Sequence, residues 1–467
     1  MIDRGKVKIS RWCHSFQKDD VAALFHSLSL RILFLKKKTS RKLFRFLEKP
    51  RTKQELVEVF GENFTFSLSV GGIIVDEHLD ETEFLNDVRE RLLDDITLEI
   101  MYLLVTDNCN LKCRYCFEEA PESDGNFKPI SMNAETAKRA IDLFVGLLKK
   151  YSNPNKKKII HLYGGEPLLN PEVVKFSVLY LERLKKGNKL LSNCEMAIVT
   201  NGVLMNEGLA KFFSDHKVTV GLSIDGPHDM NNTYRIAKNF NIDVFEKVLS
   251  AYHLLRKYKA KIGLSITLTP LAVTNFDQVL DFFIKIFHDI DGCAFNSIHF
   301  NPGVSLGDDY YYKVAVCQLK AFQKMRELGI YEERGIRRAK PFVECKPVFA
   351  DCGVVGNQLV IAPDGQIGVC QDFVKPRTYF RGSVYNVDYD PIVAGIFDGW
   401  RNRSPFFMEA CLDCGAIAIC GGGCPASAEL KTGSRWNIDE RICPNSRLFL
   451  EWLIWDTYSH LEQKLVL

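Results

Sequence analysis

Residues 109–116 read CNLKCRYC, so Cys109, Cys113 and Cys116 stand in the spacing C-x3-C-x2-C. Three thiolates this close together can hold three irons of a [4Fe-4S] cube and leave the fourth iron open to a small ligand. Zinc, or a fully ligated cluster, needs a fourth protein donor. The spacing therefore favours an iron-sulfur cluster with one open iron, with a zinc knuckle as the alternative.

Strand-like apolar runs recur around this motif and alternate with amphipathic helical patterns. The runs are LEIMYLLVT (98–106), IIHLY (159–163), MAIVTNG (196–202), VTVGLSIDGP (218–227), IGLSITLT (262–269) and CAFNSIHF (293–300). Such alternation predicts parallel βαβ units. Functional residues at the carboxyl ends of these strands are typical of a barrel-type α/β enzyme.

The motif, with Tyr115 before its last cysteine, resembles the radical SAM superfamily. The resemblance implies a partial (β/α)6 TIM-type barrel over residues 96–305, with S-adenosylmethionine (SAM) bound to the open iron. It also implies one-electron cleavage of SAM to methionine and a 5′-deoxyadenosyl radical that abstracts a hydrogen atom from the substrate.

The GGEP stretch that follows the second run has a role in this family. By resemblance, Gly164 and Gly165 let the backbone approach SAM closely, and Glu166 or its neighbouring carbonyls meet the methionine ammonium. The alternative is an ordinary strand-to-loop turn.

Four further residues resemble SAM contacts of the family. Ser223 and Asp225 of SIDGP would lie near the ribose and methionyl end, and Arg235 would clamp the SAM carboxylate. Tyr115 would line the adenine face. The alternatives are loop residues or surface charges for the first three and a packed core aromatic for Tyr115.

Eight of the nine cysteines in residues 306–467 form a pattern that resembles the SPASM extension of peptide-modifying radical SAM enzymes. The pattern is C-x12-G-x4-C from Cys352, then C-x2-C-x5-C-x3-C from Cys411, then Cys443, with Cys345 as the eighth. By resemblance to anaerobic sulfatase-maturing enzymes, these cysteines hold two further [4Fe-4S] clusters. Auxiliary cluster I would use Cys345, Cys352, Cys370 and Cys424, and auxiliary cluster II would use Cys411, Cys414, Cys420 and Cys443.

Two alternatives apply to this cysteine-rich region. A pair of zinc sites would also take four thiolates each. A variant without Cys345 as ligand would leave one iron of auxiliary cluster I open to a substrate thiolate.

Residues 1–95 differ from the barrel region in their pattern of strand-like and helical stretches, and they predict a small α+β domain. Strand-like stretches are followed by two helical patterns and the strand-like GGIIVDE, with Thr52 as a candidate cap of the second helix. The order resembles the PqqD-like domain that captures a leader peptide as an added strand. The alternative is a structural cap over the barrel.

The composition is that of an ordinary globular chain, with 46% hydrophobic and 25% charged residues, and no apolar run approaches membrane-spanning length. A net charge of +3 is too small to indicate nucleic-acid binding, so we expect neither nucleic-acid nor membrane partners. Cluster ligands need reduced thiols, which predicts a cytoplasmic location.

The combined interpretation is a radical SAM/SPASM oxidoreductase with three [4Fe-4S] clusters and SAM, acting on a precursor peptide or protein. A donor such as ferredoxin or flavodoxin would reduce it, and the favoured product is a thioether or other intramolecular crosslink in a ribosomal peptide.

Two alternative functions are also consistent with the sequence. The first is a sulfatase-maturing enzyme that oxidises a cysteine or serine to formylglycine. Its family base is an aspartate directly after the cysteine equivalent to Cys370, whereas this chain has Gln371 there and Asp372 one position later, which makes Asp372 the candidate base. The second is a non-catalytic peptide-binding protein with structural metal sites.

Overall fold

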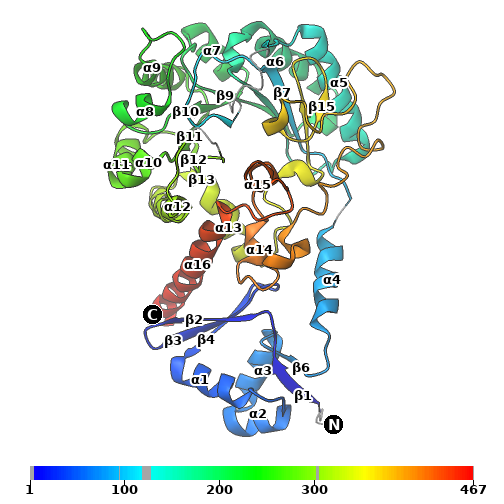
Figure 1. The fold of residues 1–467 in the computed structure, drawn as a ribbon, viewed down its shortest axis with the longest axis vertical. Helices are drawn as coiled ribbons and strands as arrows, with labels where there is room; N and C mark the ends of the chain where they lie inside the picture. The colour runs from blue at the N-terminus through cyan, green and yellow to red at the C-terminus, as the bar shows by residue number, and fades with distance from the viewer. Residues whose placement is uncertain (1–4, 94, 118–127, 301–303, 466–467) are drawn as a thin grey trace.

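The computed structural model describes residues 5–93, 95–117, 128–300 and 304–465, with side chains described up to residue 461. An α/β body, a cysteine-rich middle and a small N-terminal body follow one another along the longest axis (Figure 1). The three-cysteine motif belongs to the α/β body, and the other predicted cluster ligands belong to the middle.

Six parallel strands form the centre of the α/β body, side by side in chain order. They are β7 (Ile100–Thr106), β8 (Lys158–Gly164), β9 (Cys194–Thr200), β10 (Thr219–Ser223), β11 (Ile262–Thr267) and β12 (Gly292–Asn296). Each of the six apolar runs overlaps one of these strands, so the predicted partial (β/α)6 barrel is confirmed.

Helices follow each of these strands in the chain and cover the outer face of the sheet (Figure 1). They are α5 (Ala134–Tyr151), η2 (Pro167–Leu169), α6 (Pro171–Lys185), η3 (Lys189–Leu191), α7 (Glu207–Asp215), α8 (His228–Tyr234), α9 (Val244–Lys257), α10 (Pro270–Thr274), α11 (Phe276–Ile286) and α12 (Tyr310–Glu327). In α5, Asn133 accepts a hydrogen bond from the Thr136 amide at 2.8 Å and so caps the helix. Ile141, Phe144 and Leu148 recur at helical spacing and are buried, which fixes the face of α5 that meets the sheet.

Strands from the second half of the chain extend this sheet at both edges. They are β13 (Tyr331–Glu332), which pairs in parallel with β12, and β14 (Gln358–Ile361), which pairs in parallel with β7 and carries β15 (Ile367–Gly368) antiparallel to it. The cysteine-rich region is therefore joined to the barrel by backbone hydrogen bonds next to β7, the strand that leads into the three-cysteine motif.

Short helices and turns build the cysteine-rich middle. They are α13 (Glu333–Glu344), η4 (Gly353–Val355), η5 (Gln371–Phe373), η6 (Pro405–Phe407), η7 (Glu409–Cys411), α14 (Ile417–Cys420), α15 (Pro425–Thr432) and the long α16 (Ile442–Leu465). Buried Arg338 of α13 donates to the carbonyls of Ile419 and Cys420 at 3.0 and 2.7 Å and to Asn445 at 3.1 Å, which ties α13, α14 and α16 together. None of the described helices is both long and apolar enough to cross a membrane.

Two three-stranded antiparallel sheets and four helices make up the N-terminal body. The elements are β1 (Lys6–Ile9), β2 (Cys13–Lys18), β3 (Val21–His26), β4 (Arg31–Lys36), α1 (Lys37–Phe46), β5 (Arg51–Thr52), α2 (Lys53–Phe60), α3 (Glu62–Val70), β6 (Ile74–Asp76) and α4 (Glu81–Leu92). The sequence did not reveal β2, which is largely polar, nor α3, whose apolar residues alternate with a period of two as in a strand.

The predicted cap of α2 is present. The Thr52 hydroxyl accepts from the Glu55 amide at 3.2 Å, and the Glu55 carboxylate accepts from the Thr52 amide at 2.8 Å. These two bonds form a capping box, which satisfies backbone donors that the first turn of a helix leaves unpaired.

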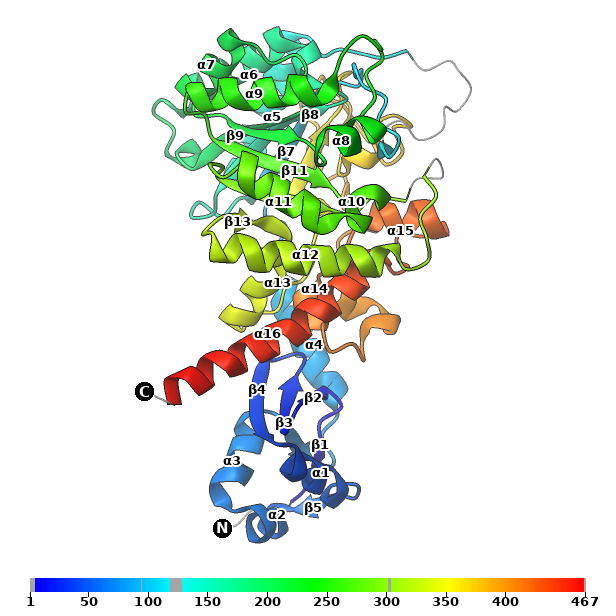
Figure 2. The same ribbon diagram turned by 90° about the vertical axis from the view of Figure 1, so that its left-hand side faces the viewer.

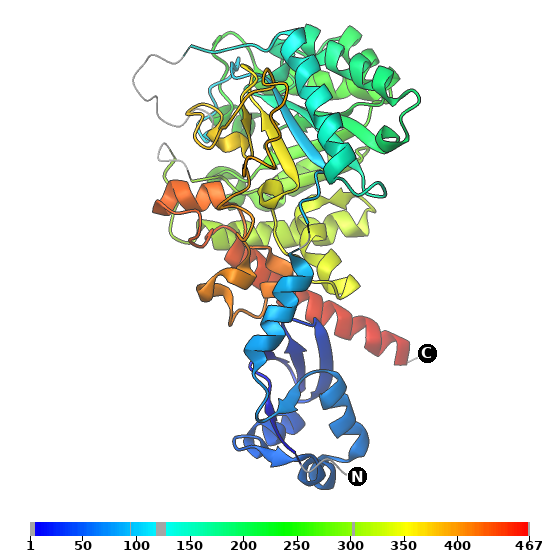
Figure 3. The same ribbon diagram turned by 90° about the vertical axis from the view of Figure 1, so that its right-hand side faces the viewer.

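The N-terminal body packs against the cysteine-rich middle through aromatic side chains. Phe25 stacks on Phe342 of α13 with ring centroids 6.0 Å apart, and Phe34 of β4 meets Tyr458 of α16 at 5.1 Å. Figures 2 and 3 both show α16 running past the β2-β3-β4 sheet. Since Phe25 is fully buried, this contact is part of the hydrophobic core and not a loose tether.

Candidate active site

The three-cysteine loop begins where β7 ends, at the carboxyl edge of the sheet. Backbone bonds from Lys112 to Ile236, from Arg114 to Tyr234 and from Lys238 to Asn110, at 2.8 to 3.0 Å, hold the loop against the segment after α8. Cys109, Cys113 and Cys116 are half-buried within it. The backbone of the three-cysteine motif is therefore held in place at the carboxyl edge of the strands, where barrel enzymes carry their catalytic groups.

Gly164 and Gly165 lie against the backbone that leads into this loop. A Cβ at Gly164 would stand 2.0 Å from the Thr106 carbonyl oxygen, and a Cβ at Gly165 would stand 2.3 Å from that of Asn108. The Gly165 amide donates to Thr106 at 3.0 Å, and the next amide, that of Glu166, donates to Asn108 at 2.8 Å. The glycine pair is thus required where β8 meets the cluster loop.

Glu166 is buried and uses both carboxylate oxygens inside the protein. It accepts from the Leu168 amide at 2.9 Å, the Thr200 hydroxyl at 2.7 Å and the Asn201 amide at 2.7 Å. Burial raises the pKa of Glu166, and the hydrogen bonds from Thr200, Asn201 and Leu168 oppose that rise. Glu166 therefore locks the end of β8 to the end of β9.

Asn201 was not predicted as a site residue. Its side-chain amide donates to Asn110 at 2.8 Å and lies 3.9 Å from the Cys109 sulfur. The signal that could have found it is the TNG turn that ends the strand-like run MAIVTNG.

Asp225, Arg235 and Tyr115 form one buried group. Nε and Nη2 of Arg235 donate to the two Asp225 carboxylate oxygens at 2.9 and 3.0 Å, and the Tyr115 hydroxyl donates to the same carboxylate. Burial acts to lower the pKa of Arg235, but the negative groups around it, with Asp225 first, raise it, so the guanidinium stays charged. Arg235, expected to clamp SAM, pairs here with Asp225, and Ser223 lies two residues before Asp225, at the end of β10.

Cys411, Cys414, Cys420 and Cys443 come together from η7, the following turn, α14 and the start of α16. Burial and then the neighbouring thiols raise the pKa of Cys411 to about 11 and that of Cys443 to about 12. Because an iron or zinc ion would offset this repulsion, the donor set fits a thiolate-bound metal centre.

Cys352, Cys370 and Cys424 form a second group. Burial raises the pKa of all three thiols, to about 12 for Cys424, and the charges of the neighbouring thiols contribute to the rise at Cys370 and Cys424. This donor set also fits a metal centre. Cys345, the expected fourth member, is exposed at the end of α13, and its sulfur lies 3.7 Å from the Phe342 carbonyl.

Asp372 lies beside this second group, in η5. Its carboxylate is 3.2 Å from Nδ1 of His299, and the ligand atoms of His299, Asp372 and Cys424 all lie within 4.8 Å of one another. The His299 ring stacks on Phe117, the residue after Cys116, at 5.3 Å between centroids. His299 was not predicted, and the apolar run CAFNSIHF that contains it gave no signal beyond a polar residue after a strand.

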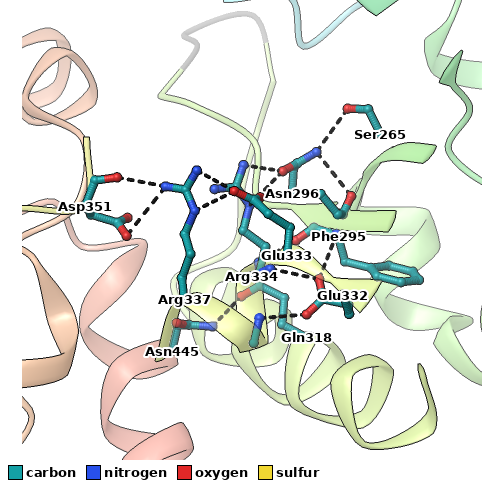
Figure 4. A network of polar contacts seen from close by, with 12 residues as sticks. Ser265, Phe295, Asn296, Gln318, Glu332, Glu333, Arg334, Arg337, Asp351 and Asn445 are labelled. Atoms are coloured by element: carbon teal, nitrogen blue, oxygen red, sulfur yellow. Dashed lines mark hydrogen bonds and ion pairs between the residues drawn. The ribbon is translucent and has the colours of Figure 1, made fainter. Parts of the chain in front are cut away.

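A polar network joins the barrel to the loop that carries Cys352 (Figure 4). Arg334 donates to Asn296 of β12 at 2.9 Å, while Arg337 donates to the Asp351 carbonyl at 2.7 Å. Glu332 accepts from the Gly335 amide at 2.7 Å, and burial raises its pKa to about 7. These charges hold α13 between the barrel and the second thiol group.

Comparisons with known proteins agree with this geometry. Residues 103–283 match the model of the Radical SAM superfamily. The cysteine-type anaerobic sulfatase-maturating enzyme of Clostridium perfringens is 24% identical over 372 residues, 76% of this chain and 96% of that enzyme. The radical SAM cyclopropyl synthase TigE of Paramaledivibacter caminithermalis is 22% identical over 481 residues, 97% of each chain. Streptococcus suis SuiB, solved with its precursor peptide SuiA, is 16% identical, covers 94% of this chain and 99% of its own, and shares the fold with a TM-score of 0.54.

Proposed function

Because residues 103–283 of this chain are a radical SAM domain, we propose that the protein is a radical SAM/SPASM maturase of a ribosomally made peptide. The observation that carries the proposal is the placement of two groups of buried or half-buried thiols in a region that shares its sheet with the three-cysteine barrel. A barrel that only generated a radical would not need them.

Cys109, Cys113 and Cys116 would hold the SAM cluster, and the chemistry supplied by that cofactor pair is reductive cleavage of SAM to a hydrogen-abstracting radical. Since the Glu166 carboxylate already accepts three hydrogen bonds, the carbonyls around Gly164 and Gly165 are the groups left for the methionine ammonium.

Four other residues would shape the SAM site. Ser223 and the Asp225–Arg235 pair would border the ribose and methionyl end, and the Tyr115 ring would line the adenine face. The pairing supports a preorganised site, because Asp225 fixes both the guanidinium of Arg235 and the hydroxyl of Tyr115.

The C-terminal thiols would hold the two auxiliary [4Fe-4S] clusters, for a total of three clusters per chain. Cys352, Cys370 and Cys424 would serve auxiliary cluster I, and the group around Cys411 and Cys443 would serve auxiliary cluster II. Their role would be to accept the substrate-derived electron or to hold the substrate. A cytoplasmic ferredoxin or flavodoxin would supply the electron that starts the reaction.

A peptide substrate is supported by the N-terminal body as well as by the relatives. Strands β2 and β4 are the edges of the β2-β3-β4 sheet, and an edge strand can bind an extended peptide by adding a strand. TigE is named as a cyclopropyl synthase and matches over nearly the whole chain, N-terminal region included. We therefore favour a leader-binding role for residues 1–95 and an intramolecular crosslink, a thioether or a carbon-carbon bond, as the product.

Formylglycine formation is the second candidate, and the observation that favours it is the similarity to the Clostridium perfringens sulfatase-maturating enzyme. Its base would be Asp372, which is nearly fully buried beside Cys424. Gln371 occupies the position where that family carries its aspartate, and this departure ranks formylglycine formation below crosslinking.

The first experiment is anaerobic incubation of the reconstituted protein with SAM and dithionite. We expect 5′-deoxyadenosine from the parent and none from the C109A/C113A/C116A variant. If the parent, with all its clusters loaded, yields no 5′-deoxyadenosine, the proposed enzymatic function is wrong. The result would support the alternative of a peptide-binding protein with structural metal sites.

The second experiment separates the two products by mass spectrometry of a cysteine-containing precursor peptide. A crosslinked peptide loses hydrogen and keeps its sulfur, whereas formylglycine formation at cysteine removes the sulfur. A peptide carrying the sulfatase motif is the matched comparison, and conversion of that peptide alone would reverse our ranking.

A further inference from the structure

Three thiols surround the place proposed for auxiliary cluster I, and a [4Fe-4S] cube has four irons. Cys352, Cys370 and Cys424 reach this place from three separate segments, before η4, before η5 and before α15. The group that approaches the fourth corner decides whether that iron is thiolate-bound, bound by another residue or open.

Cys345 lies in a different environment from the other three thiols. It is exposed and ends α13 in the left-handed conformation, with φ of 50°. Its sulfur faces the Phe342 carbonyl of its own helix at 3.7 Å.

The Asp372 carboxylate lies beside this thiol group and approaches Cys424. Its side chain is 2% exposed, and a carboxylate oxygen lies within 4.8 Å of the Cys424 sulfur. A buried carboxylate this close to a thiolate is costly unless a metal lies between them.

Two buried polar atoms beside the thiols also lack a hydrogen-bond partner among the described residues. They are Oδ2 of Asp372 and Nδ1 of His299, which face each other at 3.2 Å without hydrogen-bond geometry. Unsatisfied buried groups of this kind are uncommon in folded proteins and mark places where an ion or ligand completes the contacts. The stacking of His299 on Phe117 fixes the direction from which the imidazole meets the carboxylate.

We propose that the carboxylate of Asp372, and not the thiolate of Cys345, is the fourth protein ligand of auxiliary cluster I, with His299 as the positioning residue that orients it. The inference rests on the proposed function, since it requires the cluster. Metal-binding carboxylates are commonly held by such a second contact, which fixes the oxygen that faces the metal. His299, stacked on Phe117, would hold the Asp372 carboxylate in place for the cluster.

The ligands can be identified without turnover in the C109A/C113A/C116A variant, in which the auxiliary clusters are the ones left. We expect about eight irons per chain. In the Mössbauer spectrum, the signal of about one iron in eight should differ from the signals of the others, because its protein ligand is oxygen and theirs is sulfur. In this background Asp372→Cys should make all irons alike. Cys345→Ala, the matched control for the rival ligand, should leave both the iron content and the spectrum unchanged.

Several results would overturn the inference. Eight irons that are all thiolate-bound before any change at Asp372, or loss of cluster I on Cys345→Ala, would restore Cys345 as the ligand and leave the proposed function intact. Zinc in place of iron would overturn the proposed function and the inference together. Retention of about four irons in auxiliary cluster II shows that each variant is folded.

His299 is tested by a spectroscopic signature. His299→Leu should alter the signal of the oxygen-bound iron, and His299→Gln, which keeps a donor, should restore most of it. Labelling histidine with ¹⁵N tests the rival in which His299 itself binds the cluster. Nitrogen hyperfine coupling to the reduced auxiliary cluster would show that His299 is the ligand and would overturn the role of Asp372.

Discussion

Replacing Asp225 by asparagine tests whether the buried Asp225–Arg235 pair organises the SAM site. The two side chains are 1% and 8% exposed and share two hydrogen bonds of 2.9 and 3.0 Å. Asparagine keeps an acceptor for the Thr267 amide, which donates to Asp225 at 3.0 Å, so the change is mainly the loss of charge. Leaving the Arg235 charge buried and unpaired should cost about 3 to 5 kcal/mol of folding free energy.

A double-mutant cycle isolates this coupling. Arg235→Met should cost a similar amount because it strands the Asp225 carboxylate, whereas the double variant Asp225→Asn/Arg235→Met should cost far less than the sum, because no buried charge is left unpaired. The matched control is Asp229→Asn, whose side chain is 98% exposed and pairs with His228 at 2.8 Å. Its cost should stay within about 0.5 kcal/mol.

Urea unfolding followed by circular dichroism is the assay. Tryptophan fluorescence would miss the barrel, because all five tryptophans of the chain lie outside residues 100–296. Single-variant costs that add to the cost of the double variant within about 0.5 kcal/mol would refute the reasoning, since independent sites behave in that way.

Three further changes test other parts of the molecule. Gly165→Ala should abolish SAM-cluster assembly, measured as a loss of about four irons, because its methyl group would stand 2.3 Å from the Asn108 carbonyl oxygen; normal iron content would show that the loop yields. Burial holds the pKa of Glu332 at about 7 against its ordinary 4.5, so the folded state keeps a proton that the unfolded state has lost, and stability should fall as pH rises from 4.5 to 7. Glu332→Gln should remove about 3 kcal/mol of that dependence, read from urea midpoints across the same pH range, and an unchanged slope would contradict it. Thr52→Ala should destabilise the N-terminal body by about 1 kcal/mol, with faster hydrogen exchange in α2, and exchange at the parent rate would show that the capping box contributes nothing.

The sequence by itself determined the barrel and the kind of chemistry. Periodicity is a local property, so the six strands could be located from their apolar runs, and a three-cysteine motif needs only the few residues that contain it. Turn chemistry is equally local, which is why the cap at Thr52 could be predicted. Where the local pattern was ambiguous, as in the alternating apolar residues of α3, the sequence did not reveal the helix.

The tertiary structure alone decided which side chains meet. Arg235 and Asp225, both predicted as SAM contacts, pair with each other because α8 returns the chain to the end of β10. His299 and Asp372 are distant in sequence and lie 3.2 Å apart because the segment after β12 meets η5, while Cys345 is exposed at the end of α13. Spacing along the chain fixes a residue's neighbours within a helix or strand. Contacts between elements depend on how whole faces pack, which no single segment contains.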